Sequence, residues 1–180
     1  ETSFRWETVT RSWKEAERVA EGKVSHNAKG EALINLPPMA KSGVYRLIYQ
    51  TKDAFGASFE VSKDFFVAAS QAEVNLPLVL EAESKTRKVG ETARFFVHSG
   101  LANQPLAVEV YRAGKQISRS FLTSGKGSAI LEFPVKKEDR GGFTVVVSGL
   151  RDFQALRAEE NLLVPWSDRE LQLEFSTFRD

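Results

Sequence analysis

The sequence has 180 residues, of which 42% are hydrophobic and 27% are charged, a composition that supports packed cores and excludes a disordered chain. Its 25 basic and 24 acidic residues are scattered, so the one-sided positive field that nucleic acid requires is not expected, and the longest apolar run, Phe65–Ala69, is far shorter than the roughly 18 residues of a membrane-spanning helix. Because the chain has no cysteine, disulfides, thiolate metal sites and cysteine nucleophiles are excluded within it.

The first 28 residues allow more than one interpretation. Ser3–Val9 has the alternation of a strand, and Ser12-Trp13-Lys14-Glu15 fits the capping box of a short helix. A competing interpretation continues a sheet through Val19–Ser25 into a hairpin around Asn27-Ala28-Lys29-Gly30. The helix and the hairpin can both be present.

From Gly30 onwards the sequence predicts β-structure. Ala32–Leu36 is a strand stopped by two prolines, which cannot donate to a ladder. Val44–Lys52 and Ala57–Ala68 are strands joined by a turn at Asp53-Ala54-Phe55-Gly56. Ala69-Ser70-Gln71 is the expected linker.

Alternating apolar residues and regularly spaced turn signals then predict a complete seven-stranded antiparallel sandwich. Its expected strands are Val74–Ala82, Thr92–His98, Leu106–Arg112, Gln116–Thr123, Ser128–Val135, Phe143–Ser148 and Ala155–Val164. Pro165-Trp166-Ser167-Asp168 breaks this pattern, and Glu170–Phe178 is predicted to be the first strand of a further domain.

An internal repeat relates the two parts of the chain. Lys29–Pro37 returns as Lys126–Pro134, an offset of 126 − 29 = 97 residues. Downstream, Gly43–Leu47 resembles Gly142–Val146, and a third match follows further on: Phe65-Phe66-Val67 resembles Leu162-Leu163-Val164. This period suits one small β-sandwich per copy. The sequence therefore predicts an all-β protein of tandem antiparallel, seven-stranded, Ig-like sandwich domains, the first one partial.

The predicted domains are residues 1–70, residues 71–166 and the start of another domain at 167–180. The repeat leaves the first domain without counterparts of Val74–Ala82 and Thr92–Val97, so we expect an open sheet edge there, capped by residues 170–178 or by a neighbouring molecule. The opening residues begin in the middle of a pattern, and we expect the chain to be a segment of a longer polypeptide.

Two histidines and one glycine-rich run are candidate chemical centres. His26 is expected in a turn, and His98 either anchors a Ser/His/Asp triad or is a surface or strand-end histidine, the interpretation we favour. Gly125-Lys126-Gly127-Ser128 has the letters of a phosphate-binding loop, but it lies between two predicted strands with no helix to follow.

Paired carboxylates and tryptophans complete the candidates. Glu81 with Glu83, Glu138 with Asp139, and Glu159 with Glu160 are expected to be solvated charges on turns and edges, without a glycosidase or calcium-binding role. Three tryptophans could form a sugar-stacking platform, but we favour core anchoring and a plug at a domain junction. They are Trp6, Trp13 and Trp166.

The most specific stretch lies near the end of the chain. It is Val164-Pro165-Trp166-Ser167-Asp168-Arg169-Glu170-Leu171, running into Phe175-Ser176-Thr177-Phe178-Arg179-Asp180, and it resembles a domain junction of the bacterial alpha-2-macroglobulin family. The Lys-Gly-x-Ala strand followed by Gly43-Val44-Tyr45 and Asp53-Ala54-Phe55-Gly56 is similar to the closing half of a macroglobulin-like domain.

This resemblance implies structural domains of a broad-spectrum protease trap, a large protein that is secreted or periplasmic, with a lipid anchor on the parent chain as one option. In that family a protease cuts a bait segment, the molecule changes shape, and a Cys-Gln thioester captures the protease. The chain lacks the cysteine, and we see no long bait segment in it.

We therefore expect a non-enzymatic scaffold with no catalytic, cofactor-binding or metal residues. Its expected partners are neighbouring domains of the parent chain and, through the full-length protein, target proteases. Nucleic acid binding and membrane insertion are not expected. The alternative is an Ig-like spacer or binding module of a surface adhesin or of a polysaccharide-handling protein.

Overall fold

The computed structural model describes residues 4–39, 41–68, 74–124 and 127–166. These form two compact units: an N-terminal unit of residues 5–74, and a C-terminal unit of residues 75–166 together with Phe4. The described residues contain nine antiparallel strands in three small sheets and almost no helix, so the predicted β-rich antiparallel fold is confirmed. The predicted domain limits at 70 and 166 stay predictions.

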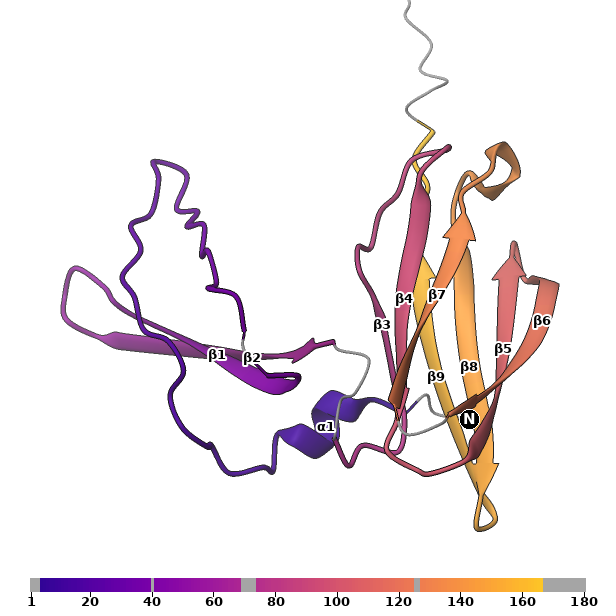
Figure 1. Ribbon diagram of the computed structural model, residues 1–180. Coiled ribbons are helices and arrows are strands. Elements are labelled where there is room, and N and C mark those ends of the chain that lie inside the picture. Colours follow the sequence, from indigo (N-terminus) through magenta and orange to yellow (C-terminus); the bar gives the residue numbers. More distant parts are fainter. Residues whose placement is uncertain (1–3, 40, 69–73, 125–126, 167–180) are drawn as a thin grey trace, which may run out of the picture. The chain divides into compact units, whose positions relative to one another are not determined.

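Seven strands build the C-terminal unit, the number predicted. They are β3 (Val79–Ala82), β4 (Thr92–Ser99), β5 (Gln104–Arg112), β6 (Lys115–Ser124), β7 (Gly127–Pro134), β8 (Phe143–Arg151) and β9 (Gln154–Leu162). One sheet has the order β3-β4-β7 and the other β6-β5-β8-β9, and Figure 1 shows them as two layers. A short 3-10 helix, Lys137–Asp139, lies between β7 and β8.

The first of these strands is shorter than predicted. It begins at Val79 and not at Val74, because Pro77 cannot donate a ladder hydrogen bond. Leu76 and Leu78 are nevertheless fully buried. The carbonyls of this segment are satisfied individually: Gly100 N donates to Leu76 O at 2.8 Å, and Ser99 Oγ donates to Pro77 O at 2.8 Å.

The core lies between the two sheets and follows the period-two alternation of their strands. Ala93, Phe95 and Val97 of β4 point inward, as predicted, and the ring centroids of Phe95 and Phe133 lie 5.7 Å apart, edge to face. Burying each such side chain contributes roughly 1.5–3 kcal/mol. The buried cluster is Leu78, Leu80, Ala93, Phe95, Val97, Leu106, Val108, Val110, Val135, Phe143, Val145, Val147, Ala158, Leu162 and Val164.

One buried ion pair fixes the connection between β7 and β8. Asp139 is 5% exposed and accepts hydrogen bonds from Arg112 Nη2 at 2.5 Å and from Lys136 N at 2.7 Å. The first bond ties the connection to the end of β5, and the second caps the 3-10 helix.

The N-terminal unit contains one short helix and one β-hairpin. They are α1 (Trp6–Thr10), β1 (Gly43–Lys52) and β2 (Ser58–Val67). The two predicted strands and the turn between them are confirmed, with Asp53 Oδ1 accepting from the backbone N–H groups of Phe55 and Ala57.

The two faces of the hairpin differ. One face carries Tyr45, Leu47 and Tyr49 beside Phe65, Lys63 and Val61 on β2. The other face carries Arg46, paired with Asp64 by bonds of 2.8 and 3.0 Å, and this face is contacted by α1 through Thr10 Oγ1, 2.7 Å from Asp64 Oδ2, and through Trp6, 6.3 Å from the Phe66 ring.

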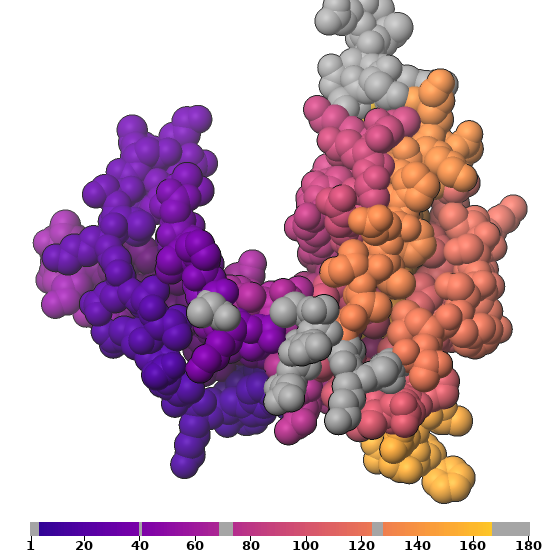
Figure 2. All heavy atoms as spheres, viewed as in Figure 1, coloured from indigo at the N-terminus to yellow at the C-terminus, as the bar shows by residue number. Residues whose placement is uncertain are grey.

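The predictions for the first 28 residues are mostly wrong. Residues 6–10 form α1 where a strand was expected, and the predicted helix at Ser12 is absent: Ser12 Oγ donates to Val9 O, closing α1. Trp6 and Thr10 stand one turn apart and are 4% and 1% exposed, so tertiary contacts place the helix, as is usual for so short a segment. Residues 14–27 have no regular structure, and much of 11–39 is exposed (Figure 2).

The predicted strand Ala32–Leu36 is also wrong, although the turn before it is confirmed. Gly30 has φ +78°, and its N–H donates to Asn27 O at 2.9 Å. The repeated stretch at 127–134 forms β7 because it pairs with β4. The described part of the N-terminal unit has no strand equivalent to β4, so residues 32–36 have no ladder to join.

The hairpins β1–β2 and β8–β9 occupy matching places in the repeat, but their registers differ by one residue. The offsets of 99 and 97 would place Phe143 opposite Leu163, as Val44 lies opposite Phe66. Phe143 instead lies opposite Leu162. A shift of one residue turns every side chain of a strand to the other face, so the likeness fixes the pairing of the strands and not the faces they present.

Two other expectations fall outside the described residues: the linker at 69–71 and the strand at 170–178. None of the helices that the structure does describe is long and apolar enough to cross a bilayer.

Replacing Gly142 with alanine is expected to destabilise the C-terminal unit by about 3 kcal/mol or more. A Cβ there would lie 2.2 Å from the carbonyl oxygen of Leu162, and φ is +112°. The matched control is Gly141→Ala, where φ is +91° but the nearest atom lies 4.0 Å away, so only the backbone cost of about 1–2 kcal/mol applies. Equal losses in urea unfolding of the two variants would contradict this account.

Acid is expected to destabilise the N-terminal unit through Asp64. Hydrogen bonds from Arg46, then from Thr10, hold the pKa of this carboxyl below its usual range, although burial opposes the shift. The ion pair therefore stabilises the fold above the unfolded-state pKa of about 3.9, and this contribution is lost as pH falls toward the lower folded value.

Asp64→Asn is expected to be less stable at neutral pH and to show a flatter dependence of unfolding free energy on pH below about 4. Trp166→Phe in the background restricts tryptophan fluorescence to the N-terminal unit, which contains Trp6 and Trp13. Glu21→Gln, which removes a solvent-exposed ion pair with Arg18, is the control and should leave the pH dependence of the unfolding free energy below about 4 unchanged. If Asp64→Asn also leaves that pH dependence unchanged, the role of this carboxylate is refuted.

Candidate functional site

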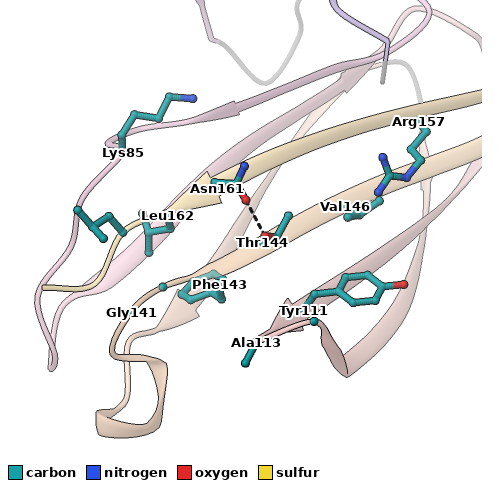
Figure 3. A pocket seen from close by; sticks show the side chains of 13 residues that line it. Lys85, Tyr111, Ala113, Gly141, Phe143, Thr144, Val146, Arg157, Asn161 and Leu162 are labelled. Carbon is teal, nitrogen blue, oxygen red and sulfur yellow. Dashed lines mark hydrogen bonds between the residues drawn. The ribbon is translucent and has the colours of Figure 1, made fainter. Parts of the chain in front are cut away.

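A shallow groove of about 520 Å³ lies on the outer face of the four-stranded sheet, toward the end where β5 meets β6 and where β8 begins (Figure 3). Its lining residues are Lys85, Tyr111, Ala113, Gly114, Gly141, Gly142, Phe143, Thr144, Val146, Arg157, Asn161, Leu162 and Leu163. All of them belong to the C-terminal unit.

Strand alternation places the polar lining residues. Val110, Val145 and Ala158 point into the core, so their neighbours in β5, β8 and β9 point outward. The register then aligns three of them in one row across the sheet: Tyr111 opposite Thr144, and Thr144 opposite Asn161.

The floor of the groove is apolar. Val146 is 3% exposed although it stands on the outer face of the sheet, between Glu109 and Glu159 on the neighbouring strands. Larger side chains diagonal to it, Tyr111 and Arg157, lie on either side of it in Figure 3. A buried valine on a solvent-facing sheet surface gives this groove a hydrophobic centre with a polar rim.

The rim groups already have partners. Thr144 Oγ1 donates to Asn161 Oδ1 at 2.6 Å, and the Arg157 guanidinium lies 2.7 Å from Glu159. Tyr111 OH donates to Glu109 Oε2 at 3.2 Å. Lys85, at one end of the groove, forms an ion pair with Glu160. These partnerships hold the rim in one arrangement.

Burial raises the pKa of Tyr111, and the hydrogen bond and negative charge of Glu109 raise it further, while Arg157 and Arg119 act in the opposite direction. The phenol is therefore neutral at physiological pH. It serves as a hydrogen-bonding group and not as a general base, since a base must release its proton near the working pH.

The backbone at the end of the groove does not offer an anion site. Gly141 N donates to Val164 O at 2.9 Å, and Gly142 N donates to Asp139 O at 2.8 Å. The thirteen lining residues include no carboxylate and no histidine. This chemistry suits contact with an aromatic, apolar or amide surface.

His98 is buried, so the expectation of a surface position is wrong, while its place near the end of β4 is confirmed. It is 2% exposed, its Nδ1 lies 3.2 Å from Ser128 Oγ directly across the ladder, and its ring is parallel to Phe96 at 6.4 Å. Serine and histidine are thus together, as in a triad, but closed to substrate. His26, in the N-terminal unit, bonds Tyr49 OH through Nε2 at 2.8 Å.

The carboxylates singled out from the sequence face cations. Glu83 lies 2.6 Å from Arg87, and Glu159 and Glu160 pair with Arg157 and Lys85. Asp139 is buried and not solvated as expected, whereas its neighbour Glu138 is exposed. Glu83 is exposed, and Glu81 is half-buried. In the described parts of the chain, no cluster of three or more histidine, aspartate or glutamate side chains is placed to hold a metal ion.

The tryptophans serve different purposes. Core anchoring is confirmed for Trp6 and wrong for Trp13, which is 39% exposed. Trp166 is 57% exposed, and its place as a plug at a domain junction stays a prediction. The Arg140 guanidinium lies over the Trp166 ring at 5.9 Å. Of the glycine-rich run, residues 125–126 lie outside the described residues, and Gly127 and Ser128 begin β7, as the strand interpretation required.

Sequence reasoning did not single out the groove. Tyr111, Arg157 and Asn161 are separated by up to 50 residues, and only the pairing of β5 with β8 and of β8 with β9 brings them together. Their common signal is an outward position in alternating strands, which many solvated residues share.

Comparison of the chain with models of known protein families and with curated proteins found no match.

Removing the Tyr111 ring is expected to expose Val146 and destabilise the C-terminal unit. Tyr111→Ala should lower the unfolding free energy by about 2 kcal/mol, because the ring's burial and the cover of the valine are both lost. Tyr111→Phe, the matched variant, loses only a hydrogen bond to Glu109 and should cost about 0.5–1 kcal/mol. Urea unfolding checks both, and a larger loss for phenylalanine than for alanine would refute a packing role.

Proposed function

We propose that this chain is a non-catalytic scaffold, a pair of macroglobulin-like domains from a bacterial alpha-2-macroglobulin-type protease trap, the first domain being partial. The observation that carries the proposal is where the chain leaves the seven-stranded unit. Val164 is the last core residue, fully buried, and Pro165 and Trp166 follow it directly. This is the step at which the resemblance in sequence places the junction between two domains.

Residues 163–164, where the chain leaves the seven-stranded unit, are held by backbone hydrogen bonds. Leu163 N donates to Lys85 O at 2.9 Å, and Arg87 N donates to Leu163 O at 3.1 Å. Val164 O accepts from Gly141 N at 2.9 Å. Three backbone hydrogen bonds thus attach residues 163–164 to two separate loops of the sandwich, so a displacement at the exit is transmitted to the whole unit.

The remaining parts of the proposal follow from the same resemblance. The parent protein acts outside the cytoplasm, in the periplasm or after secretion, and its lipid anchor, if present, lies elsewhere on the parent. Proteases meet the parent through a bait segment outside these residues. This chain contacts neighbouring domains of the same polypeptide.

The groove favours a second candidate, an Ig-like binding or spacer module of a surface or polysaccharide-handling protein. An aromatic side chain, an arginine and an amide around an apolar floor are groups that stack on and hydrogen-bond to a sugar or a peptide. The Tyr111 ring would be the principal contact.

Protease assays on the parent protein and on the 180-residue chain test the proposal. The parent should protect a large protein substrate from several unrelated proteases while leaving cleavage of a small peptide substrate intact, because a trap excludes by size. The isolated chain should inhibit none of them. A parent that protects no substrate would refute the proposal.

A glycan array with the isolated chain tests the second candidate. Specific binding that Tyr111→Ala abolishes and Tyr111→Phe retains would favour the binding module over the scaffold. Phe121→Ser, on the same sheet but outside the groove, is the control, since its side chain is 72% exposed.

A further inference from the structure

We propose that the N-terminal unit accepts two antiparallel strands, one at the free edge of β1 and one beside residues 30–37. Both strands come from one segment of the same polypeptide, which lies outside these 180 residues and has the side-chain pattern of residues 92–112. The C-terminal unit supplies the template on which this inference rests. It does not depend on which of the two candidate functions is correct.

The first acceptor is the edge of β1. In the described residues β1 pairs only with β2, whereas its repeat equivalent β8 pairs with β9 on one side and with β5 on the other. Residues 144–148 of β8 pair with β5, and in the repeat they correspond to residues 45–49 of β1. A hairpin of two strands alone is marginally stable in water, and α1 supports this one on a single face, so a third strand at the free edge would stabilise it further.

The edge of β1 also lacks the usual protection against pairing. Edge strands are commonly guarded by charges or proline, but residues 45–49 are Tyr-Arg-Leu-Ile-Tyr, and the one charge, Arg46, is occupied by Asp64 of β2. Ile48 is 41% exposed on one face, and Val61 and Phe59 are 50% and 60% exposed on the other. Both faces therefore have apolar surface that an added strand would extend and cover.

The second acceptor is the stretch 30–37. Its repeat equivalent forms β7 because β4 lies beside it, and there Phe133 packs edge to face on Phe95 of β4. The residue equivalent to Phe133 is Leu36, which is 44% exposed, and its neighbour Leu33 is 80% exposed. The apolar pattern of a strand is present here, but among the residues that the structure describes no strand lies beside it.

One occupant satisfies both positions. β4 and β5 are consecutive in the chain and separated by a short connection at 100–103, yet they belong to different sheets. A strand–loop–strand segment of the same design, with alternating apolar residues and about 20 residues long, pairs with 30–37 through its first strand and with β1 through its second. A second copy of this chain has its own β4 and β5 already paired within its sandwich.

Amide hydrogen exchange measured by mass spectrometry tests the inference. In the 180-residue chain, peptides from β1 should exchange at least about 100-fold faster than those from β8, because β8 is paired on both sides. In a chain extended N-terminally with the parent sequence, exchange in β1 and in 30–37 should slow by about 100-fold or more, while β8 stays unchanged. No slowing in the extended chain would overturn the inference.

Two substitutions sharpen the test in the extended chain. Leu36→Ser should accelerate exchange in β1 about tenfold or more, as expected for a residue that has become core. Leu33→Ser, equivalent to Ile130 on the exposed side of β7, should change it less than about threefold. In the 180-residue chain neither substitution should matter, and equal effects of the two in the extended chain would overturn the assignment of 30–37.

Two further outcomes would overturn the proposed donor segment and identify a different one. Protection of β1 that grows with concentration of the 180-residue chain, together with a dimer in light scattering, would identify a second copy. Faster exchange in β1 after truncation behind Trp166 would identify residues 167–180 as the strand donor.

Discussion

Strand pairing is the constraint on which the rest of this structure depends. A backbone N–H or C=O that leaves water must find a partner, so a stretch with the side-chain pattern of a strand becomes one only where a neighbouring strand is present. The repeat makes the comparison within one molecule. Similar residues form β7 beside β4 in one unit and lie without regular structure at 32–36 in the other, where no such neighbour is described. The side-chain pattern is similar in both places, and the partner strand is the difference to which we attribute the different structures.

Arginine–aspartate pairs fix segments that strand pairing does not: Asp139 is buried, and Arg46 and Asp64 are half-buried. Asp139 ties β5 to the connection before β8, and Asp64 ties β1 and β2 to α1 through Arg46 and Thr10. Each carboxylate accepts hydrogen bonds from its arginine and from one further group, Lys136 N for Asp139 and Thr10 Oγ1 for Asp64, which offsets part of its loss of hydration. These bonds hold each pair in one geometry. In both units the pair lies where a non-strand segment joins a sheet, at the point where a ladder cannot specify the path.

The sequence was sufficient for most strands of the C-terminal unit, because alternation, turn residues and burial there all point the same way. Prediction from the sequence failed where contacts between distant segments determine the local structure. α1 exists because Trp6 and Thr10 reach the hairpin, and no local signal distinguishes it from a strand. Val74–Leu78 alternates like a strand but is buried without a ladder, since Pro77 interrupts donation. The groove could not be predicted from the sequence for a different reason. Tyr111, Thr144 and Asn161 lie side by side because of the register between strands, which the local sequence does not determine.

The same physics bears on how such a unit acts. Side chains that chemistry would recruit are engaged in holding strands together: His98 with Ser128, Glu160 with Lys85, Asp139 with Arg112. Each of these pairs joins two segments that are distant in the sequence. Residues 163–164 are bonded to the loop at Lys85–Arg87 and to Gly141. Under the proposed scaffold function, a displacement of the chain at its exit would act on both of these loops.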